Sequence, residues 1–305
     1  MKKFNKIFLL AIVICMPIFF IGCSINSIGQ EDKKSTLAKG FFWKATKGDD
    51  FIYLVGTMHP DKSNINYLND TMKKIIKETD ALALEIDFSD ENTKKSLDKI
   101  NKENTYLKQG ELNNLLTNKE QEKFKRILES LDFKYEDIKN LTPEAISNLI
   151  KKEIYVRAGF NGNTSDIFLQ NTYNSNNKKV ISLENINDQH KIISKNTTDL
   201  KKFINEFNAK TIEKEIKTGN EIMYAFITGD SNYMEEYVKD NQLKNKDDYN
   251  NLLKDRNKKM VEKIDNLIKE NENYAVAVGT MHFFGNDSII KLLQEKGYEV
   301  TKLKS

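Results

Sequence analysis

The stretch Phe51–His59 reads FIYLVGTMH, and the stretch Tyr274–His282 reads YAVAVGTMH. Each is an apolar run that ends in the same tetrapeptide, Gly-Thr-Met-His. Short, continuous apolar runs of this kind are typical of strands that are buried on both faces of a sheet. Because open α/β folds place their active sites at the carboxyl ends of strands, we expect His59 and His282 to meet at one site.

The sequence around the two copies predicts an α/β fold with a mixed central sheet built from both ends of the chain. Apolar runs at 41–45 and 51–55 flank a Gly-Asp turn and predict a hairpin. Large, strongly charged helical insertions are expected at about 91–175 and 186–271. The other expected elements are a helix at 64–79, strands at 81–87, 178–183, 274–279 and 298–303, and a helix at 286–296.

The N-terminus predicts a lipoprotein signal peptide at residues 1–22. Three lysines among the first six residues precede the apolar run Ile7–Ile21, which is shorter than the roughly 20 residues of a membrane span. The sequence FIGC at Phe20–Cys23 resembles the bacterial lipobox, which implies cleavage before Cys23 and attachment of a lipid to its sulfur. An uncleaved anchor is the alternative. Either would hold the remainder at the extracytoplasmic face of the cell membrane.

Composition limits the possible functions of the remaining chain. Residues 23–38 are expected to be a lipidated tether, which leaves 39–305 as the α/β domain. The chain has 48 Lys and Arg against 45 Asp and Glu, and loss of the signal peptide would make these numbers equal. A neutral chain has no basic field for nucleic acid. Both cysteines, Cys15 and Cys23, are N-terminal, which excludes disulfide scaffolds, cysteine–zinc sites and cysteine nucleophiles.

Glu85 adds a carboxylate to the two histidines. It lies in the apolar strand predicted at 81–87, where a charged side chain needs a partner or a bound ion. His59, Glu85 and His282 could together hold a divalent metal ion such as Mn, Co or Zn, with one position left open. Such an ion would acidify a bound water, and Glu85 is a candidate base as well as a ligand. The alternative for the histidines is a hydrogen-bonded, structural position in the core.

Other candidate residues surround this set. Gly56 and Gly279 allow a sharp turn or a close backbone approach, or are ordinary strand-end glycines. Arg256 is one of only three arginines. It is a candidate catalytic residue that stabilises an oxyanion, with a helix-surface ion pair as the alternative. Asp87 faces the same side of its strand as Glu85, and we expect it at an exposed strand end, with an assisting position at the site as the alternative. His190 is expected to be exposed.

Several of these motifs together resemble the TraB/PrgY/GumN family, which is related to the Tiki proteins. The shared features are two Gly-x-x-His motifs and an apolar strand that contains a Glu, here Glu85, and the resemblance covers about 40–303. Glu184 and Gln189 match a Leu-Glu segment that is followed by Gln. The residues of a family Arg-Asn pair are matched by Arg256 and Asn257, and a segment around Asp166 resembles a family Gly-x-Asp after a longer preceding stretch.

This resemblance implies an active site at the carboxyl edge of the sheet and metal-dependent hydrolysis of peptides, as described for the Tiki relatives. The PrgY-like members limit the response to secreted peptide pheromones, by cleavage or by sequestration. The leading prediction is a membrane-tethered, extracytoplasmic, metal-dependent hydrolase with a peptide substrate. A non-catalytic lipoprotein that sequesters peptides is the alternative, and hydrolysis of a non-peptide ester is a third. Glu184 is expected near the site or at a helix cap, and Gln189 in a supporting position.

Overall fold

A computed structural model of the chain describes residues 35–59, 62, 64–162, 164–194, 199–270 and 272–305. The predicted signal peptide and Cys23 lie outside these residues, as does most of the predicted tether. Within the described part, the structure contains no helix with the length and apolar character of a membrane span. The chain forms two compact units. The described residues of 35–87, 162–184 and 220–305 form the sheet unit, and those of 88–161 and 185–219 form the helical unit.

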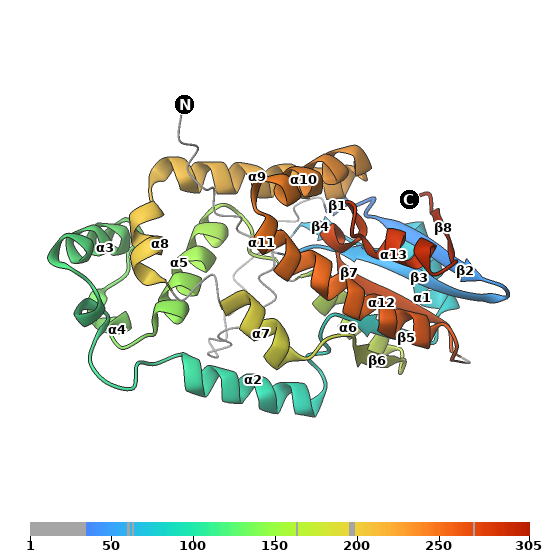
Figure 1. The fold of residues 1–305 in the computed structure, drawn as a ribbon, viewed down its shortest axis with the longest axis horizontal. Helices are drawn as coiled ribbons and strands as arrows, with labels where there is room; N and C mark the ends of the chain where they lie inside the picture. Colours follow the sequence, from blue (N-terminus) through green and yellow to red (C-terminus); the bar gives the residue numbers. More distant parts are fainter. Residues whose placement is uncertain (1–34, 60–61, 63, 163, 195–198, 271) are drawn as a thin grey trace. The chain divides into compact units, whose positions relative to one another are not determined.

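The sheet unit contains a six-stranded sheet whose strands come from both ends of the chain (Figure 1). Its strands are β2 (Phe42–Lys47), β3 (Asp50–Thr57), β5 (Ala81–Leu84), β6 (Lys179–Ser182), β7 (Tyr274–Gly279) and β8 (Glu299–Lys302). The order is β6-β5-β7-β3-β2-β8. The first four strands in this order run parallel, whereas β2 is antiparallel to both of its neighbours. The predicted α/β fold with a mixed sheet is therefore confirmed.

Helices cover both faces of this sheet, which is why its central strands are apolar throughout. On one face, Leu82 and Leu84 of β5 belong to a buried cluster with residues of α1 (Asp70–Glu78) and α6 (Ser165–Ser175). Figure 1 shows α12 (Asp255–Leu267) and α13 (Ile289–Glu295) in front of the sheet and α1 behind it. The second half of α9 (Ala209–Thr228) and α10 (Ser231–Lys244) also belong to the sheet unit.

The helix predicted at 64–79 is wrong at its beginning. Ile65–Asn66 forms a short strand, β4, that pairs in parallel with Thr36–Leu37, β1. Helix α1 begins only at Asp70, because the side chain of Asn69 accepts a hydrogen bond from the amide of Met72 at 2.8 Å. This is the usual N-cap arrangement. The local cap and the strand pairing therefore outweigh the helical spacing of the apolar residues before it.

The long C-terminal helical stretch is also interrupted. It contains α11 (Lys246–Tyr249), a π-helical turn at Asn250–Lys254 and then α12. A π-helical turn inserts an extra residue into the helical repeat and is frequent at functional sites. Here it directly precedes Arg256, which is only 1% exposed.

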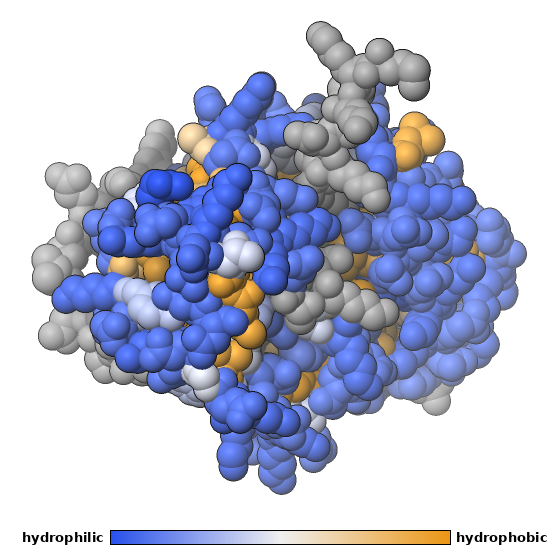
Figure 2. Space-filling view, turned by 60° about the vertical axis from the view of Figure 1, so that its left-hand side comes forward, coloured by the Kyte–Doolittle hydropathy of each residue, from blue (hydrophilic) through white to orange (hydrophobic). Residues whose placement is uncertain are grey.

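The helical unit has its own apolar core, in which Leu112, Ile146, Ile150 and Ile204 are completely buried. Its helices are α2 (Glu91–Asn104), α3 (Asn118–Ser130), α4 (Tyr135–Ile138), α5 (Pro143–Arg157), α7 (Ile186–Ser194), α8 (Leu200–Glu206) and the first part of α9. The view of Figure 2 shows mostly hydrophilic side chains, with hydrophobic ones in narrow areas between them. This fits a sequence in which 30% of the residues are charged.

Two expectations of exposure are wrong. The side chain of His190, in α7, is 12% exposed, and its Nε2 atom lies 3.0 Å from Oε1 of Glu144 in α5. Asp87, just after β5, is buried, and its amide donates a hydrogen bond to Oγ of Ser182 at 2.8 Å. In both cases a neighbouring element within the same unit covers a residue that is polar in sequence.

Candidate active site

Four parallel strands end at one edge of the sheet, and a predicted site residue follows the end of each strand. Thr57 of β3 pairs with Gly279 of β7, and Leu84 of β5 pairs with both Ala277 of β7 and Ser182 of β6. The strand ends are therefore nearly level. The residues that follow them are His59 after β3, His282 after β7, Glu85 after β5 and Glu184 after β6.

His282 lies in a 3-10 turn, Thr280–Phe283, and is buried. Its Nδ1 atom is 2.5 Å from Oδ1 of Asn257. The amide nitrogen of Asn257 donates to the backbone oxygens of His282 and Asp287, at 3.3 and 2.7 Å, so its oxygen faces the imidazole. An oxygen can only accept, so Nδ1 carries the proton and Nε2 of the neutral ring has a free lone pair. That atom lies 3.6 Å from Oε1 of Glu85.

The neutral form of His282 is favoured by its surroundings. Burial, together with the positive charge of Arg256, lowers the pKa of His282 to about 3, although Glu85 acts in the opposite direction. A neutral imidazole with Nδ1–H fixed by an oxygen is the form in which histidines bind metal ions through Nε2.

Glu85 takes part in a buried ionic cluster with Arg256 and Glu184. Nη2 of Arg256 donates to Oε2 of Glu85 and to Oε2 of Glu184, both at 2.6 Å, and Nε donates to Oε1 of Glu184 at 2.9 Å. Oε1 of Glu85 accepts from the amide of Gly279 at 2.8 Å. The alternative that Arg256 forms an ion pair on a helix surface is therefore wrong, because its guanidinium is buried.

These contacts hold the cluster in its ionised form. Burial by itself would raise the pKa of Glu85, but the charge of Arg256, with further contributions from both histidines and the Gly279 amide, lowers it to about 2. Burial would lower the pKa of Arg256, and the two carboxylates more than reverse this effect. The cluster thus contains one positive and two negative side chains.

His59 contacts a different partner. It is buried after β3, and its Nε2 atom lies 2.5 Å from Oδ2 of Asp166, in the first turn of α6. Oδ1 of Asp166 accepts from Oγ1 of Thr57 at 3.1 Å. The amide of Met58 donates to Oγ of Ser165 at 2.7 Å, which ties the first tetrapeptide to the start of α6.

The two glycines of the tetrapeptides allow close approaches. A Cβ atom on Gly56 would lie 2.8 Å from Oγ1 of Thr280, which donates to the backbone oxygen of Thr57 at 2.8 Å. A Cβ atom on Gly279 would lie 3.2 Å from Oε1 of Glu85. The first glycine therefore brings the two copies together, and the second leaves room for the carboxylate of Glu85.

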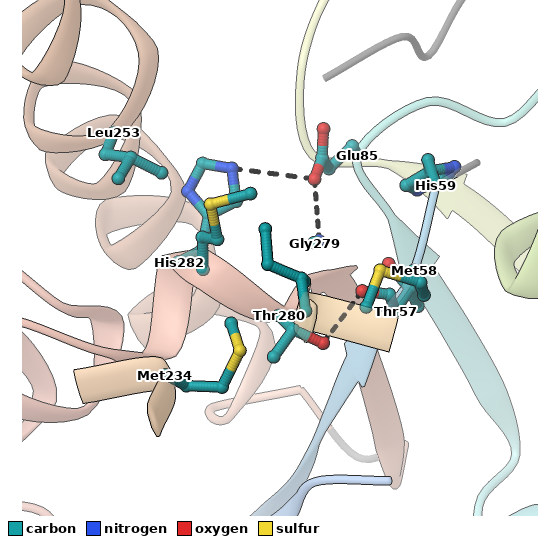
Figure 3. A pocket seen from close by; sticks show the side chains of 11 residues that line it. Thr57, Met58, His59, Glu85, Met234, Leu253, Gly279, Thr280 and His282 are labelled. Atoms are coloured by element: carbon teal, nitrogen blue, oxygen red, sulfur yellow. Dashed lines mark hydrogen bonds and ion pairs between the residues drawn. The ribbon is translucent and has the colours of Figure 1, made fainter. Parts of the chain in front are cut away.

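Both histidines and Glu85 line one small pocket of about 30 Å³ (Figure 3). Figure 3 shows the ring of His282 directed towards Glu85, with His59 on the other side of Glu85 in this view. The apolar part of the wall comes from residues such as Met234 and Leu253. This volume accommodates one or two waters, or an ion with a water.

The sequence model of the TraB/PrgY/gumN family matches residues 41–302. The chain belongs to this family. Searches of curated proteins and of solved structures gave no match. The family match covers every residue of the pocket and of the ionic cluster, so these residues belong to the family's region of the chain.

The donor atoms at this site suit a divalent cation and occur as two pairs. One pair is Nε2 of His59 with Oδ2 of Asp166, and the other is Nε2 of His282 with Oε1 of Glu85. Among the residues that the structure describes, no three His, Cys, Asp or Glu side chains form a group that could hold a metal ion. The imidazole nitrogens and carboxylate oxygens nevertheless fit such an ion by their chemistry, because nitrogen and oxygen donors suit Mn, Co and Zn.

The remaining predicted residues have varied positions. Glu184 binds Arg256 and does not line the pocket. Gln189 is buried in α7, within the helical unit. No role was predicted for Asp166 or Asn257, although both lie in segments that resemble the family. Their signal was weak because a carboxylate at a helix start and an amide inside a helix usually serve as a cap or a surface group.

Proposed function

We propose that this chain is a membrane-tethered, extracytoplasmic, metal-dependent hydrolase that acts on peptides. The observation that carries the proposal is the common pocket of His59, Glu85 and His282, with Nε2 of His282 available as a lone-pair donor. Membership of the family supports the same type of site. The peptide substrate and the membrane anchor rest on the resemblance and on the N-terminal sequence.

The balance of buried charge favours a bound cation. Glu85 and Glu184 share one arginine, and the low pKa of Glu85 means that a proton does not neutralise it near pH 7. Buried carboxylates are costly unless positive charge nearby balances them. A divalent ion beside Glu85 would supply that compensation.

Each residue then has a role that follows from its contacts. A bound metal ion would supply an acidified water and polarise the scissile carbonyl. His59, Glu85 and His282 would hold the ion. Glu85 fits the part of a ligand better than that of a base, because a carboxylate with a pKa of about 2 is a weak proton acceptor.

Arg256 fits a positioning role. Nε and Nη2 of its guanidinium are engaged by Glu85 and Glu184, and Nη1 donates to the backbone oxygen of Leu252 at 3.0 Å. Few of its N–H groups remain for an oxyanion of the substrate. We therefore propose that Arg256 orients Glu85 instead of stabilising the oxyanion directly.

The test is cleavage of a fluorogenic peptide library by the full-length protein in detergent, with Mn, Co or Zn added. We expect turnover that is lost with a chelator and in His282→Ala, and retained in the matched control His190→Gln, whose histidine lies in the helical unit. Thermal melting would verify that both variants fold. Turnover that is indifferent to the chelator and to His282→Ala would overturn the metal-dependent mechanism.

The same samples distinguish sequestration from catalysis. Tight binding of a peptide without turnover, unchanged in His282→Ala, would support the non-catalytic alternative.

The membrane tether has its own test, which is labelling of cells with a radioactive or clickable lipid precursor. We expect label in the wild type and none in Cys23→Ala, and equal labelling would exclude lipidation at Cys23.

A further inference from the structure

Asp166 has a buried oxygen atom that accepts no hydrogen bond from the described residues. The residue is 4% exposed, and among the residues that the structure describes its Oδ2 atom has an ion-pair contact but no hydrogen-bond donor. Carboxylate oxygens buried in this way are costly unless a donor or a cation compensates them. The atom lies 2.5 Å from Nε2 of His59, but the two are not aligned as a hydrogen bond.

The contacts around Asp166 fix its orientation. Oγ1 of Thr57 donates to Oδ1 at 3.1 Å, so the carboxylate can turn only its second oxygen towards His59. Ser165 and Met58 are joined by two hydrogen bonds in which the Ser165 hydroxyl takes part, at 2.7 and 3.3 Å. The start of α6 and the first tetrapeptide are therefore held together as one preorganised unit.

We propose that Oδ2 of Asp166 is a metal ligand that binds the same divalent ion as Nε2 of His59. An anionic oxygen and an imidazole nitrogen that face each other without a hydrogen bond are a suitable pair of donors for one cation. Asp166 would also add negative charge to a site where one arginine faces two glutamates. The inference rests on the proposed function, because it assigns a further donor to the same metal site.

The alternative role for Asp166 is to orient His59 by accepting a proton from its ring. A residue of that kind affects the affinity for the metal ion through the histidine and leaves the ligand set unchanged. The two roles therefore differ in the absorption spectrum of a bound Co²⁺ ion, which depends on the identity and number of its ligands.

The experiment is a titration of the full-length protein with Co²⁺, followed by calorimetry and by visible absorption. Asp166→Asn keeps the size of the side chain and the acceptor for Thr57 but removes the charge. We expect Co²⁺ to bind at least about tenfold more weakly, with an altered absorption band. Unchanged affinity and spectrum would overturn the assignment, and so would weaker binding with an unchanged band.

A second variant keeps the test decisive if Asp166→Asn does not fold. Thr57→Val removes the hydroxyl that orients the carboxylate and preserves the shape of the strand residue. We expect a few-fold loss of Co²⁺ affinity, and no loss would contradict the inference. Wild-type protein that binds neither Co²⁺, Mn²⁺ nor Zn²⁺ would overturn the metal-dependent function itself. Wild-type binding and turnover with an unaffected Asp166→Asn would overturn only the role of Asp166.

Discussion

The two copies of Gly-Thr-Met-His have the same sequence and different surroundings. The first follows β3, and its histidine contacts the carboxylate of Asp166. The second forms a 3-10 turn, and its histidine contacts the amide of Asn257 and lies 3.6 Å from Glu85. The tetrapeptide thus places an imidazole after a strand, and side chains on the neighbouring helices determine which ring nitrogen carries the proton and whether the ring is charged. Variants that alter one set of surroundings should therefore affect the two copies unequally.

Removal of the arginine near the second copy should have the largest effect on stability. Arg256→Met leaves Glu85 and Glu184 buried without their counter-charge, and we expect a loss of about 3–5 kcal/mol in the free energy of unfolding. Chemical denaturation measures this free energy. The matched control is Arg157→Met, because the side chain of Arg157 is 42% exposed and forms ion pairs on the surface. There we expect a much smaller loss, because exposed ion pairs contribute little to stability, and equal losses in the two variants would contradict this expectation.

The two glycines should tolerate a methyl group unequally. In Gly56→Ala the new Cβ atom would lie 2.8 Å from Oγ1 of Thr280, and we expect a loss of about 1–3 kcal/mol, as for other overpacked sites. In Gly279→Ala the nearest atom, Oε1 of Glu85, is 3.2 Å away, so the loss should be smaller. Denaturation curves of the two variants test this order, and a larger loss in Gly279→Ala than in Gly56→Ala would contradict it.

Acid should destabilise the second copy through its histidine. The pKa of His282 falls from 6.5 to about 3 in the folded chain, so between these values the unfolded chain binds a proton that the folded chain does not. The free energy of unfolding should therefore decrease as the pH falls from about 6.5 towards 3, with a slope of up to one proton. Denaturation at several pH values with a chelator present would show a shallower slope in His282→Gln. A slope unchanged in His282→Gln would contradict the assignment.

A last change makes the second copy resemble the first. Asn257→Asp places a carboxylate beside Nδ1 of His282, as Asp166 stands beside His59, and should raise the pKa of His282. It also removes the amide that donates to the backbone oxygens of His282 and Asp287, so a loss of stability should accompany it. Nitrogen-15 NMR of the imidazole rings reports both the proton position and the pKa. We expect the wild-type His282 ring to carry its proton on Nδ1. A proton on Nε2 would exclude the lone-pair role assigned to that atom.

The sequence predicts the sheet well because its strands are buried on both faces. The apolar runs before Gly56 and Gly279 can form few other structures, and the position of Glu85 follows from the strand before it. The repeat itself suggested that His59 and His282 lie at one edge. Two local features were not predicted. Helix α1 begins after the N-cap at Asn69 in spite of the helical spacing of the apolar residues before it, and a π-helical turn interrupts the long C-terminal helix.

The partners of the histidines could not be predicted in the same way. Asp166 is 109 residues from Thr57 in sequence and Asn257 is 25 residues from His282, and the packing of their helices on the sheet decides what they touch. A carboxylate such as Asp166 is stabilised at the start of a helix by the helix dipole, so its presence there does not by itself indicate a site residue. The burial of Arg256 could not be predicted for the same reason, because the sequence does not reveal which face of α12 contacts the two glutamates.

The central claim is that both imidazoles belong to one metal site, and a Co²⁺ titration of four proteins tests it most directly. These are the wild type, His59→Ala, His282→Ala and the double variant, each compared with His190→Gln. We expect either single variant to lose most of the affinity for Co²⁺ and the double variant to lose little more, because the two rings bind one ion. Co²⁺ bound as tightly by both single variants as by the wild type, or losses that add fully in the double variant, would contradict it.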